Sequence, residues 1–224
     1  MKAIEAGYEI LDPISVDGIE ELKKIERAAR TCYKSEDKIT EDGSSARNMV
    51  SGLIKSGHEA MLEHGGLTVR FVCDRGVSHE LVRHRMASFA QESTRYCNYS
   101  KDKFGNELTF VMPTLYKSDF MEDEAWNCWV ETMKKCEESY MKLIKMGVSP
   151  QMARSVLPNS LKTEVVVTAN WREWRHILSL RCAPDAHPDI RCLMIDLLEE
   201  LHDKIPVLFD DIWEKYGITA TFKE

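Results

Sequence analysis

The order of strand-like and helix-like segments is the feature that most constrains the fold of this chain. Apolar alternation and short apolar runs predict strands at residues 3–11, 67–73, 108–112 and 161–169. Helical spacing of apolar residues predicts helices at residues 17–34, 45–56, 77–86, 171–180, 188–203 and 206–216. These segments do not follow the βαβ rhythm of a doubly wound sheet. We therefore expect an α+β fold, a single domain over residues 1–224, with helices flanking a mixed or antiparallel sheet.

The longest helix is expected at about residues 119–146. Its apolar residues recur at helical spacing, and they are Trp126, Trp129, Val130, Met133, Tyr140 and Ile144. An aromatic stripe of this kind is more typical of core or subunit packing than of a cofactor site. Residues 87–107 are expected to form a loop, which would let Ser93 and Arg95 wrap around a ligand.

The balance of charges limits the classes of partner. The chain carries 30 Lys and Arg against 37 Asp and Glu, a formal net charge of −7. An acidic body disfavours general nucleic-acid binding, so we expect no nucleic-acid partner. The arginine clusters at residues 83–95 and 172–181 are then interpreted as local anion sites.

Cysteine usage and hydropathy indicate the compartment. Seven cysteines without a C-x-x-C pair argue against a disulfide framework and a zinc ribbon. The N-terminal stretch MKAIEAGYEIL alternates and carries acidic residues, which is not typical of a signal peptide. No apolar run reaches the length of about 18 residues that a spanning helix needs. We therefore expect a cytoplasmic protein without a membrane partner.

A metal site is weakly suggested around residues 57–64. His58, Glu59, Glu63 and His64 cluster there. The two histidines are six residues apart, however, and not the i, i+4 pair that places two ligands on one helical face. We expect no metal, and locally His58 is read as a hydrogen-bonded histidine at a helix end.

The stretch RHRMASFAQESTR, residues 83–95, carries the strongest chemical signal. Arginine offers a rigid fork of five donors that suits phosphate or a carbonyl edge, and Ser93 adds a neutral donor. The plain alternative is a helix C-terminus that attracts cations, with Glu80 as an ion-pair partner. In a helix, however, Arg83, His84 and Arg85 would point in three directions. This divergence favours a site shared between several ligands or subunits.

The same stretch resembles the signature of the flavin-dependent thymidylate synthases, an Arg-His-Arg separated by seven residues from a Ser. The resemblance runs from about Ala3 to about Phe209. Further matches follow in order: GHEAMLEH at 57–64, QMARSVLP at 151–158 and TANWREWRHILSLR at 168–181. Four such stretches in sequence are a strong signal, whereas one alone would be weak.

The resemblance implies two sets of ligand contacts. The FAD set is His58, Ala60, Arg83, His84, Arg85, Gln91, Asn170, Arg172 and His176. The dUMP set is Glu80, Arg83, Gln91, Glu92, Ser93, Thr94, Arg95, Arg154 and Arg181.

Several of these assignments have a plain alternative. Asn170 is also a plausible helix cap, and Arg154 could be a surface cation. Ala60, Glu80 and Glu92 depart from the residues common in the family, which weakens direct contacts from their side chains.

The implied reaction is reductive methylation of dUMP to dTMP. The co-substrates are methylenetetrahydrofolate and NADPH, with FAD delivering hydride. Arg181 is the implied catalytic residue, and its permanent charge can stabilise negative charge on the uracil ring but cannot shuttle a proton. Neither Cys97 nor Ser93 has an obvious base to activate it as a nucleophile.

The resemblance also implies a homotetramer with shared sites. Two rival functions stay open from sequence. One is an enzyme that keeps the flavin but hydroxymethylates dUMP. The other is a non-enzymatic anion- or RNA-binding module built on the arginine clusters, and the acidic net charge of the chain disfavours it.

Overall fold

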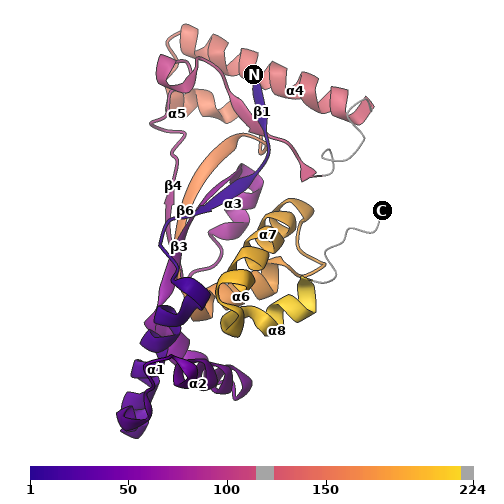
Figure 1. The fold of residues 1–224 in the computed structure, drawn as a ribbon. Coiled ribbons are helices and arrows are strands. Elements are labelled where there is room, and N and C mark those ends of the chain that lie inside the picture. Colours follow the sequence, from indigo (N-terminus) through magenta and orange to yellow (C-terminus); the bar gives the residue numbers. More distant parts are fainter. Residues whose placement is uncertain (115–123, 218–224) are drawn as a thin grey trace. The chain divides into compact units, whose positions relative to one another are not determined.

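The computed structural model describes residues 1–114 and 124–217 and has the expected mixed α+β architecture (Figure 1). An antiparallel four-stranded sheet has the strand order β2-β3-β6-β4, and β1 pairs with β5 in a small parallel sheet. The strands are β1 (Lys2–Ile4), β2 (Gly7–Ile10), β3 (Gly66–Asp74), β4 (Ser88–Gln91), β5 (Thr109–Val111) and β6 (Lys162–Asn170). The α-helices are α1 (Ile19–Tyr33), α2 (Ser44–Lys55), α3 (Arg75–Leu81), α4 (Glu124–Lys145), α5 (Pro150–Ala153), α6 (Trp171–Arg181), α7 (Pro188–Lys204) and α8 (Pro206–Tyr216).

The chain divides into two compact units, and it crosses between them within each strand of the larger sheet and once more after Arg83. The first unit contains Met1–Tyr8, Arg70–Arg83 and Phe89–Val166. The second contains Glu9–Val69, His84–Ser88 and Val167–Glu224. A single domain over residues 1–224 stays a prediction, because a division into compact units does not decide the number of domains.

The core of the first unit forms around α4. Met133 and Tyr140 of this helix are buried against Leu108 and Phe110, with Trp129 packed at the edge of the cluster. The aromatic stripe therefore serves packing, as its helical spacing predicted. The described helix begins at Glu124, and residues 119–123 of the expected range lie outside the described residues.

The second unit buries its apolar residues between α1, α2, α6, α7 and α8. The start of α6 is fixed against β3. The indole nitrogen of Trp174 donates to the carbonyl of Leu67 at 2.9 Å, and the amide of Trp171 donates to the carbonyl of Gly65 at 3.1 Å. Next to it, a Cβ on Gly66 would lie 2.3 Å from the carbonyl oxygen of Ala169. Only glycine permits this close approach of β3 and β6.

Three expectations about local structure were wrong. The strand predicted at residues 3–11 is two strands, because β1 pairs with β5 while β2 joins the larger sheet. The loop predicted at 87–107 begins with β4, which is hydrogen-bonded to β6. The helix predicted at 77–86 ends at Leu81, since the chain turns there and buries His84. Arg83, His84 and Arg85 therefore do not diverge along a helix.

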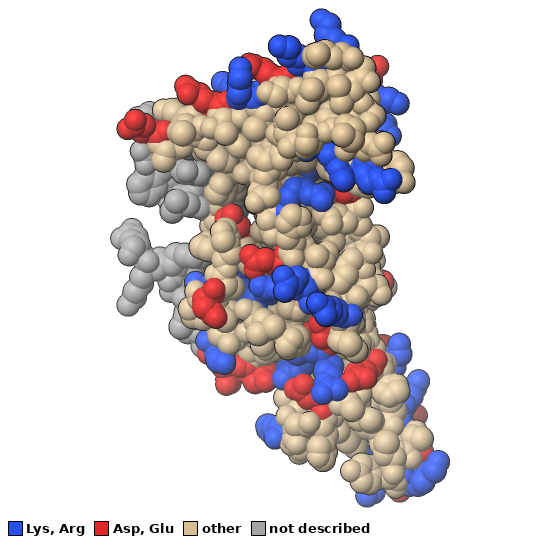
Figure 2. Space-filling model, turned by 180° about the vertical axis from the view of Figure 1, so that it is seen from behind, with Lys and Arg blue, Asp and Glu red and all other residues tan. Residues whose placement is uncertain are grey.

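Two surface properties bear on possible partners. None of the helices in the described ranges is long and apolar enough to cross a membrane. On the face shown in Figure 2, basic and acidic side chains are intermixed. That face therefore carries no single continuous basic field among its described residues.

Candidate functional site

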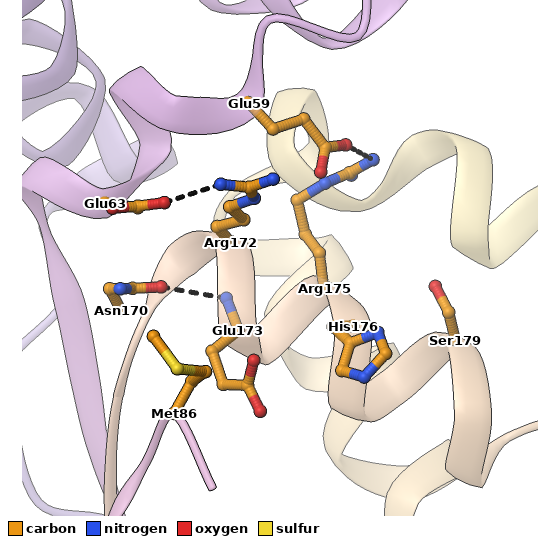
Figure 3. Close-up of a pocket in the computed structure, with 9 residues that line it drawn as sticks. All are labelled: Glu59, Glu63, Met86, Asn170, Arg172, Glu173, Arg175, His176 and Ser179. Carbon is orange, nitrogen blue, oxygen red and sulfur yellow. Dashed lines mark hydrogen bonds and ion pairs between the residues drawn. The ribbon is translucent and has the colours of Figure 1, made fainter. Parts of the chain in front are cut away.

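A cavity of about 470 Å³ opens along α6 in the second unit (Figure 3). Three residues expected to bind FAD line it, namely Asn170, Arg172 and His176. Arg172 and His176 are one helical turn apart and share a face. Asn170 is the N-cap of α6, and its side-chain oxygen accepts from the amide of Glu173 at 2.9 Å. The expected capping role of Asn170 is thus confirmed, and its side-chain amide nitrogen can still donate to a ligand.

Two arginines in this cavity are paired with carboxylates from the 3₁₀ helix η3 (Glu59–His64). Arg172 lies 2.6 Å from Glu63, and both side chains are about half exposed. Arg175 is buried, lies 3.3 Å from Glu59 and also binds Asp211 at 2.8 Å. Figure 3 shows both guanidinium groups extended towards the two glutamates. Arg175 is therefore a structural cation, whereas Arg172 can exchange its exposed partner for another anion.

His84 and Arg181 are in direct contact in the second unit. The Nε of Arg181 donates to Nε2 of His84 at 3.0 Å, and His84 is only 5% exposed. Burial, then the charges of Arg181 and His176, lower the pKa of His84 from 6.5 to about 4. The Nδ1 of His84 lies 3.8 Å from the carboxylate of Glu173, whose pKa is raised by burial. At neutral pH His84 is therefore an uncharged acceptor for the expected catalytic arginine.

A second cavity, of about 480 Å³, lies in the first unit. Thr94 and Arg154, both expected to bind dUMP, line it and are joined by a hydrogen bond in which Nη1 of Arg154 donates to Oγ1 of Thr94 at 3.2 Å. Arg154 is exposed and Thr94 is buried. An exposed arginine whose guanidinium is oriented by a hydrogen bond at one nitrogen is suited to an anion such as a phosphate.

The residues before Thr94 are fixed by side-chain contacts within the first unit. The side-chain amide nitrogen of Gln91 donates to the hydroxyl of Ser78 at 2.9 Å. Glu92 accepts from the hydroxyl of Tyr99 at 2.8 Å and pairs with Lys162 at 3.0 Å. The carboxylate of Glu92 is thus occupied by protein partners, and this segment is anchored where the expected phosphate loop begins.

The other expected dUMP residues lie around this loop or at the end of α3. Ser93 is half-buried, and its hydroxyl accepts from the amide of Arg95 at 3.3 Å. Arg95 is exposed, with its guanidinium 5.5 Å from the ring centre of Tyr96. Glu80 is half-buried in the last turn of α3, and Arg83 is exposed in the turn after this helix. Arg83 and Arg95 do not line the cavity that contains Thr94 and Arg154.

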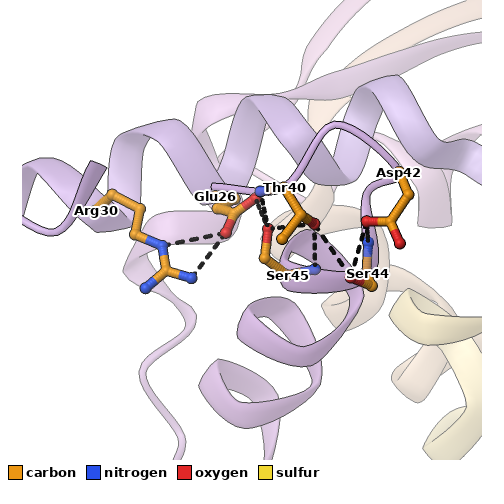
Figure 4. A network of polar contacts seen from close by, with 6 residues as sticks. All are labelled: Glu26, Arg30, Thr40, Asp42, Ser44 and Ser45. Carbon is orange, nitrogen blue, oxygen red and sulfur yellow. Dashed lines mark hydrogen bonds and ion pairs between the residues drawn. The ribbon is translucent and has the colours of Figure 1, made fainter. Parts of the chain in front are cut away.

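Six expected FAD residues do not line the α6 cavity: Arg83, His84 and Gln91, whose places are given above, and His58, Ala60 and Arg85. His58 lines another cavity of the second unit, of about 530 Å³, between α1 and α2. A polar network joins those two helices, in which the buried carboxylate of Glu26 binds Arg30 and Ser45 (Figure 4). Ala60 on η3 and Arg85 in the turn before β4 are exposed and line neither cavity.

Sequence reasoning missed residues that share these cavities. Arg75 and His79, one turn apart on α3, line the cavity of Thr94 and Arg154. Ser179 lines the α6 cavity one turn after His176. The helical spacing of these residues was a signal that could have found them. Glu59 and Glu63 carried no such signal, because they reach the cavity from a different element.

Cys97, Cys73 and Cys182 are not activated as nucleophiles. Burial, together with the charge of Glu92, raises the pKa of the Cys97 thiol, so the thiolate is disfavoured. Burial also raises the pKa values of Cys73 and Cys182 to about 12. Within the described ranges, no group of three His, Cys, Asp or Glu side chains is arranged to hold a metal ion.

Comparison with known proteins places the chain in a family. Residues 16–207 match the model of the Thy1 family, described as thymidylate synthase complementing protein. A flavin-dependent thymidylate synthase of Corynebacterium aurimucosum is 34% identical over 200 residues, covering 84% of this chain and 78% of the relative. The enzyme of the same name from Geobacter sulfurreducens is 33% identical over 189 residues, covering 82% and 78%.

A solved structure shares the fold. The crystal structure of the UMP/dUMP methylase PolB from Streptomyces cacaoi bound with 5-Br dUMP matches with a TM-score of 0.76. The match covers 97% of this chain and 98% of that one at 24% identity, so it supports the fold alone. The resemblance that began with residues 83–95 is confirmed by matches over most of the sequence: this chain belongs to the Thy1 family, that of the flavin-dependent thymidylate synthases.

Proposed function

We propose that this protein is a flavin-dependent thymidylate synthase that converts dUMP to dTMP by reductive methylation. The observation that carries the proposal is the α6 cavity. Three residues that the family resemblance assigns to the flavin, Asn170, Arg172 and His176, line this one cavity. Family membership supplies the reaction class. We propose methylenetetrahydrofolate as the carbon donor and NADPH as the reductant, in keeping with the flavin-dependent enzymes among the relatives.

The donor set of the α6 cavity fits an anionic flavin cofactor. The guanidinium of Arg172 is exposed and is paired with the exposed carboxylate of Glu63, so it can turn to a pyrophosphate. Asn170 offers an amide donor and His176 an exposed imidazole. FAD reduced by NADPH would supply the hydride, and the protein would supply orientation and charge.

Arg181 is proposed to stabilise negative charge on the uracil ring of dUMP. Its Nε donates to Nε2 of His84, and a guanidinium carries four further N–H donors on its two Nη groups. A guanidinium cannot accept a proton at working pH, so its contribution is electrostatic. Thr94, Arg154 and the loop Gln91–Arg95 are proposed to hold the nucleotide, with the phosphate bound by Ser93, Arg95 and Arg154.

The absorbance of the purified protein tests the proposed function. We expect a flavin spectrum and faster NADPH oxidation when dUMP is added, with dTMP as the product by mass. Equal oxidation rates with and without dUMP would contradict the proposal. A hydroxymethylated nucleotide would identify the rival product instead.

The ion pair between Arg172 and Glu63 gives a second test. Replacing Glu63 with Gln removes the carboxylate that competes for Arg172, so FAD should bind about two- to fivefold more tightly, the range of an exposed ion pair. Flavin fluorescence quenching during titration measures this affinity. Glu200→Gln is the matched control, because Glu200 forms an exposed pair with Lys204 on α7 and should leave the affinity unchanged. Weaker binding in Glu63→Gln would show that Glu63 itself supports the site.

Assembly and location complete the proposal. A homotetramer with shared sites is proposed because the expected FAD residues His58, Ala60 and Arg85 do not reach the α6 cavity within one chain. Light scattering of the purified protein tests the number of subunits. The proposed location is the cytoplasm, where all seven cysteines, which are free, would stay reduced.

A further inference from the structure

The geometry points to His84 as a positioning residue for Arg181, acting through its Nε2 as a neutral hydrogen-bond acceptor. The inference rests on the proposed function, because it assigns Arg181 its charge-stabilising role. The family resemblance implies that His84 contacts the flavin. Orienting Arg181 would be a second role of the same side chain.

The direction of the contact follows from arginine chemistry. Arginine has five donors and no acceptor, so the 3.0 Å contact between Arg181 Nε and His84 Nε2 requires a lone pair on Nε2. A neutral imidazole with an accepting Nε2 carries its proton on Nδ1. The geometry therefore specifies one tautomer of His84.

The surroundings of His84 favour this tautomer. Three charged or titratable groups of α6 face the ring, and they are Glu173, His176 and Arg181. The carboxylate of Glu173 lies 3.8 Å from Nδ1, too far for a hydrogen bond but close enough to favour a proton there. The ring of His176 lies edge-on, with centroids 5.9 Å apart. Burial and the cation of Arg181 disfavour a second proton on the ring.

The contact restrains the guanidinium of Arg181. With Nε bound to a buried ring, the plane of the guanidinium is held and its Nη edge is presented in a fixed direction. The side chain of Arg181 is only half-buried, so a hydrogen bond to a buried ring restricts the rotamers that it can adopt. A misplacement of about 1 Å in a catalytic group can cost up to about 10²-fold in rate.

Nitrogen NMR of the full-length protein labelled with ¹⁵N-histidine tests the tautomer without any activity measurement. We expect the His84 signals, assigned by their loss in His84→Gln, to show a protonated Nδ1 and an unprotonated Nε2. They should keep this pattern from pH 8 down to pH 5, since the pKa of His84 is about 4. A protonated Nε2 at neutral pH would overturn the inference, even in a protein that makes dTMP.

Kinetics separate positioning from a structural role. His84→Leu removes the acceptor, so kcat should fall by about 10- to 100-fold while the KM for dUMP stays within about twofold. His84→Gln places an amide oxygen near the position of Nε2 and should recover most of kcat. Equal losses in the two variants would overturn the inference. If His84→Leu does not fold, the tautomer of the unmodified protein and the kcat of His84→Gln decide the matter.

Discussion

Arg181→Ala is expected to lower kcat by about 10²- to 10³-fold, the usual cost of removing a donor aimed at developing negative charge. The same substitution should hardly change thermal stability. The side chain is half-buried, and a hydrogen bond such as the one to His84 contributes about 1 kcal/mol to the free energy of unfolding. For a chain of this size, that corresponds to a shift in Tm of about 2–4 °C.

The matched control for Arg181→Ala is Arg47→Ala. Arg47 lies on α2, pairs with Asp17 at 3.5 Å and is half-buried like Arg181, so its loss removes a comparable guanidinium from an unrelated place. Steady-state kinetics with saturating dUMP and differential scanning calorimetry provide the two readouts. A fall of more than about 8 °C in Tm, or a kcat close to that of Arg47→Ala, would show that Arg181 is structural.

Lys162→Met is expected to destabilise the protein by about 2–3 kcal/mol, since it leaves the carboxylate of Glu92 with little solvent and without its cation. Lys162 also binds Glu164 at 2.5 Å. Burial alone would lower the pKa of Lys162, but the hydrogen bonds to Glu164 and Glu92 raise it overall, so the lysine is charged at neutral pH. The same substitution should raise the KM for dUMP, because Glu92 anchors the start of the segment Ser93–Arg95.

The double variant Glu92→Leu/Lys162→Met isolates the pair. Replacing both charges with apolar side chains removes the unpaired carboxylate and should recover most of the lost stability. Urea unfolding of the two single variants and the double variant measures the coupling. Additive losses in the double variant would mean that the pair makes no specific contribution, and an unchanged KM for dUMP would show that the anchor does not influence the nucleotide site.

Local periodicity predicted much of the fold. The helices α1, α2, α6, α7 and α8 and the strands β3 and β6 lie close to their expected residues, because their apolar faces are regular. On α6 the same regularity placed Arg172 and His176 together, and the structure shows them in one cavity. Contacts that depend on helical spacing within one element are therefore readable from the sequence.

Contacts between distant segments were not readable. The sequence around Val82 contains no glycine or proline that would mark the end of α3. The burial of His84 against Arg181, 97 residues later, accompanies the turn there. In the same way, Thr94 meets Arg154 across 60 residues and Glu92 meets Lys162 across 70. Long-range pairing of this kind leaves no local pattern, so Glu92 was recognised only as an unusual residue and its partner was not foreseen.

Gly66 shows how a position without a side chain can govern chemistry that it never touches. A single methyl group there would collide with Ala169, the residue just before the cap of α6. To relieve the collision, the N-terminus of α6 would have to move. This shift would displace together the residues that the helix carries towards the site, which are Asn170, Arg172, His176 and Arg181. The tolerance of the enzyme to substitution at this distant point should therefore be as low as at a residue that binds the nucleotide itself.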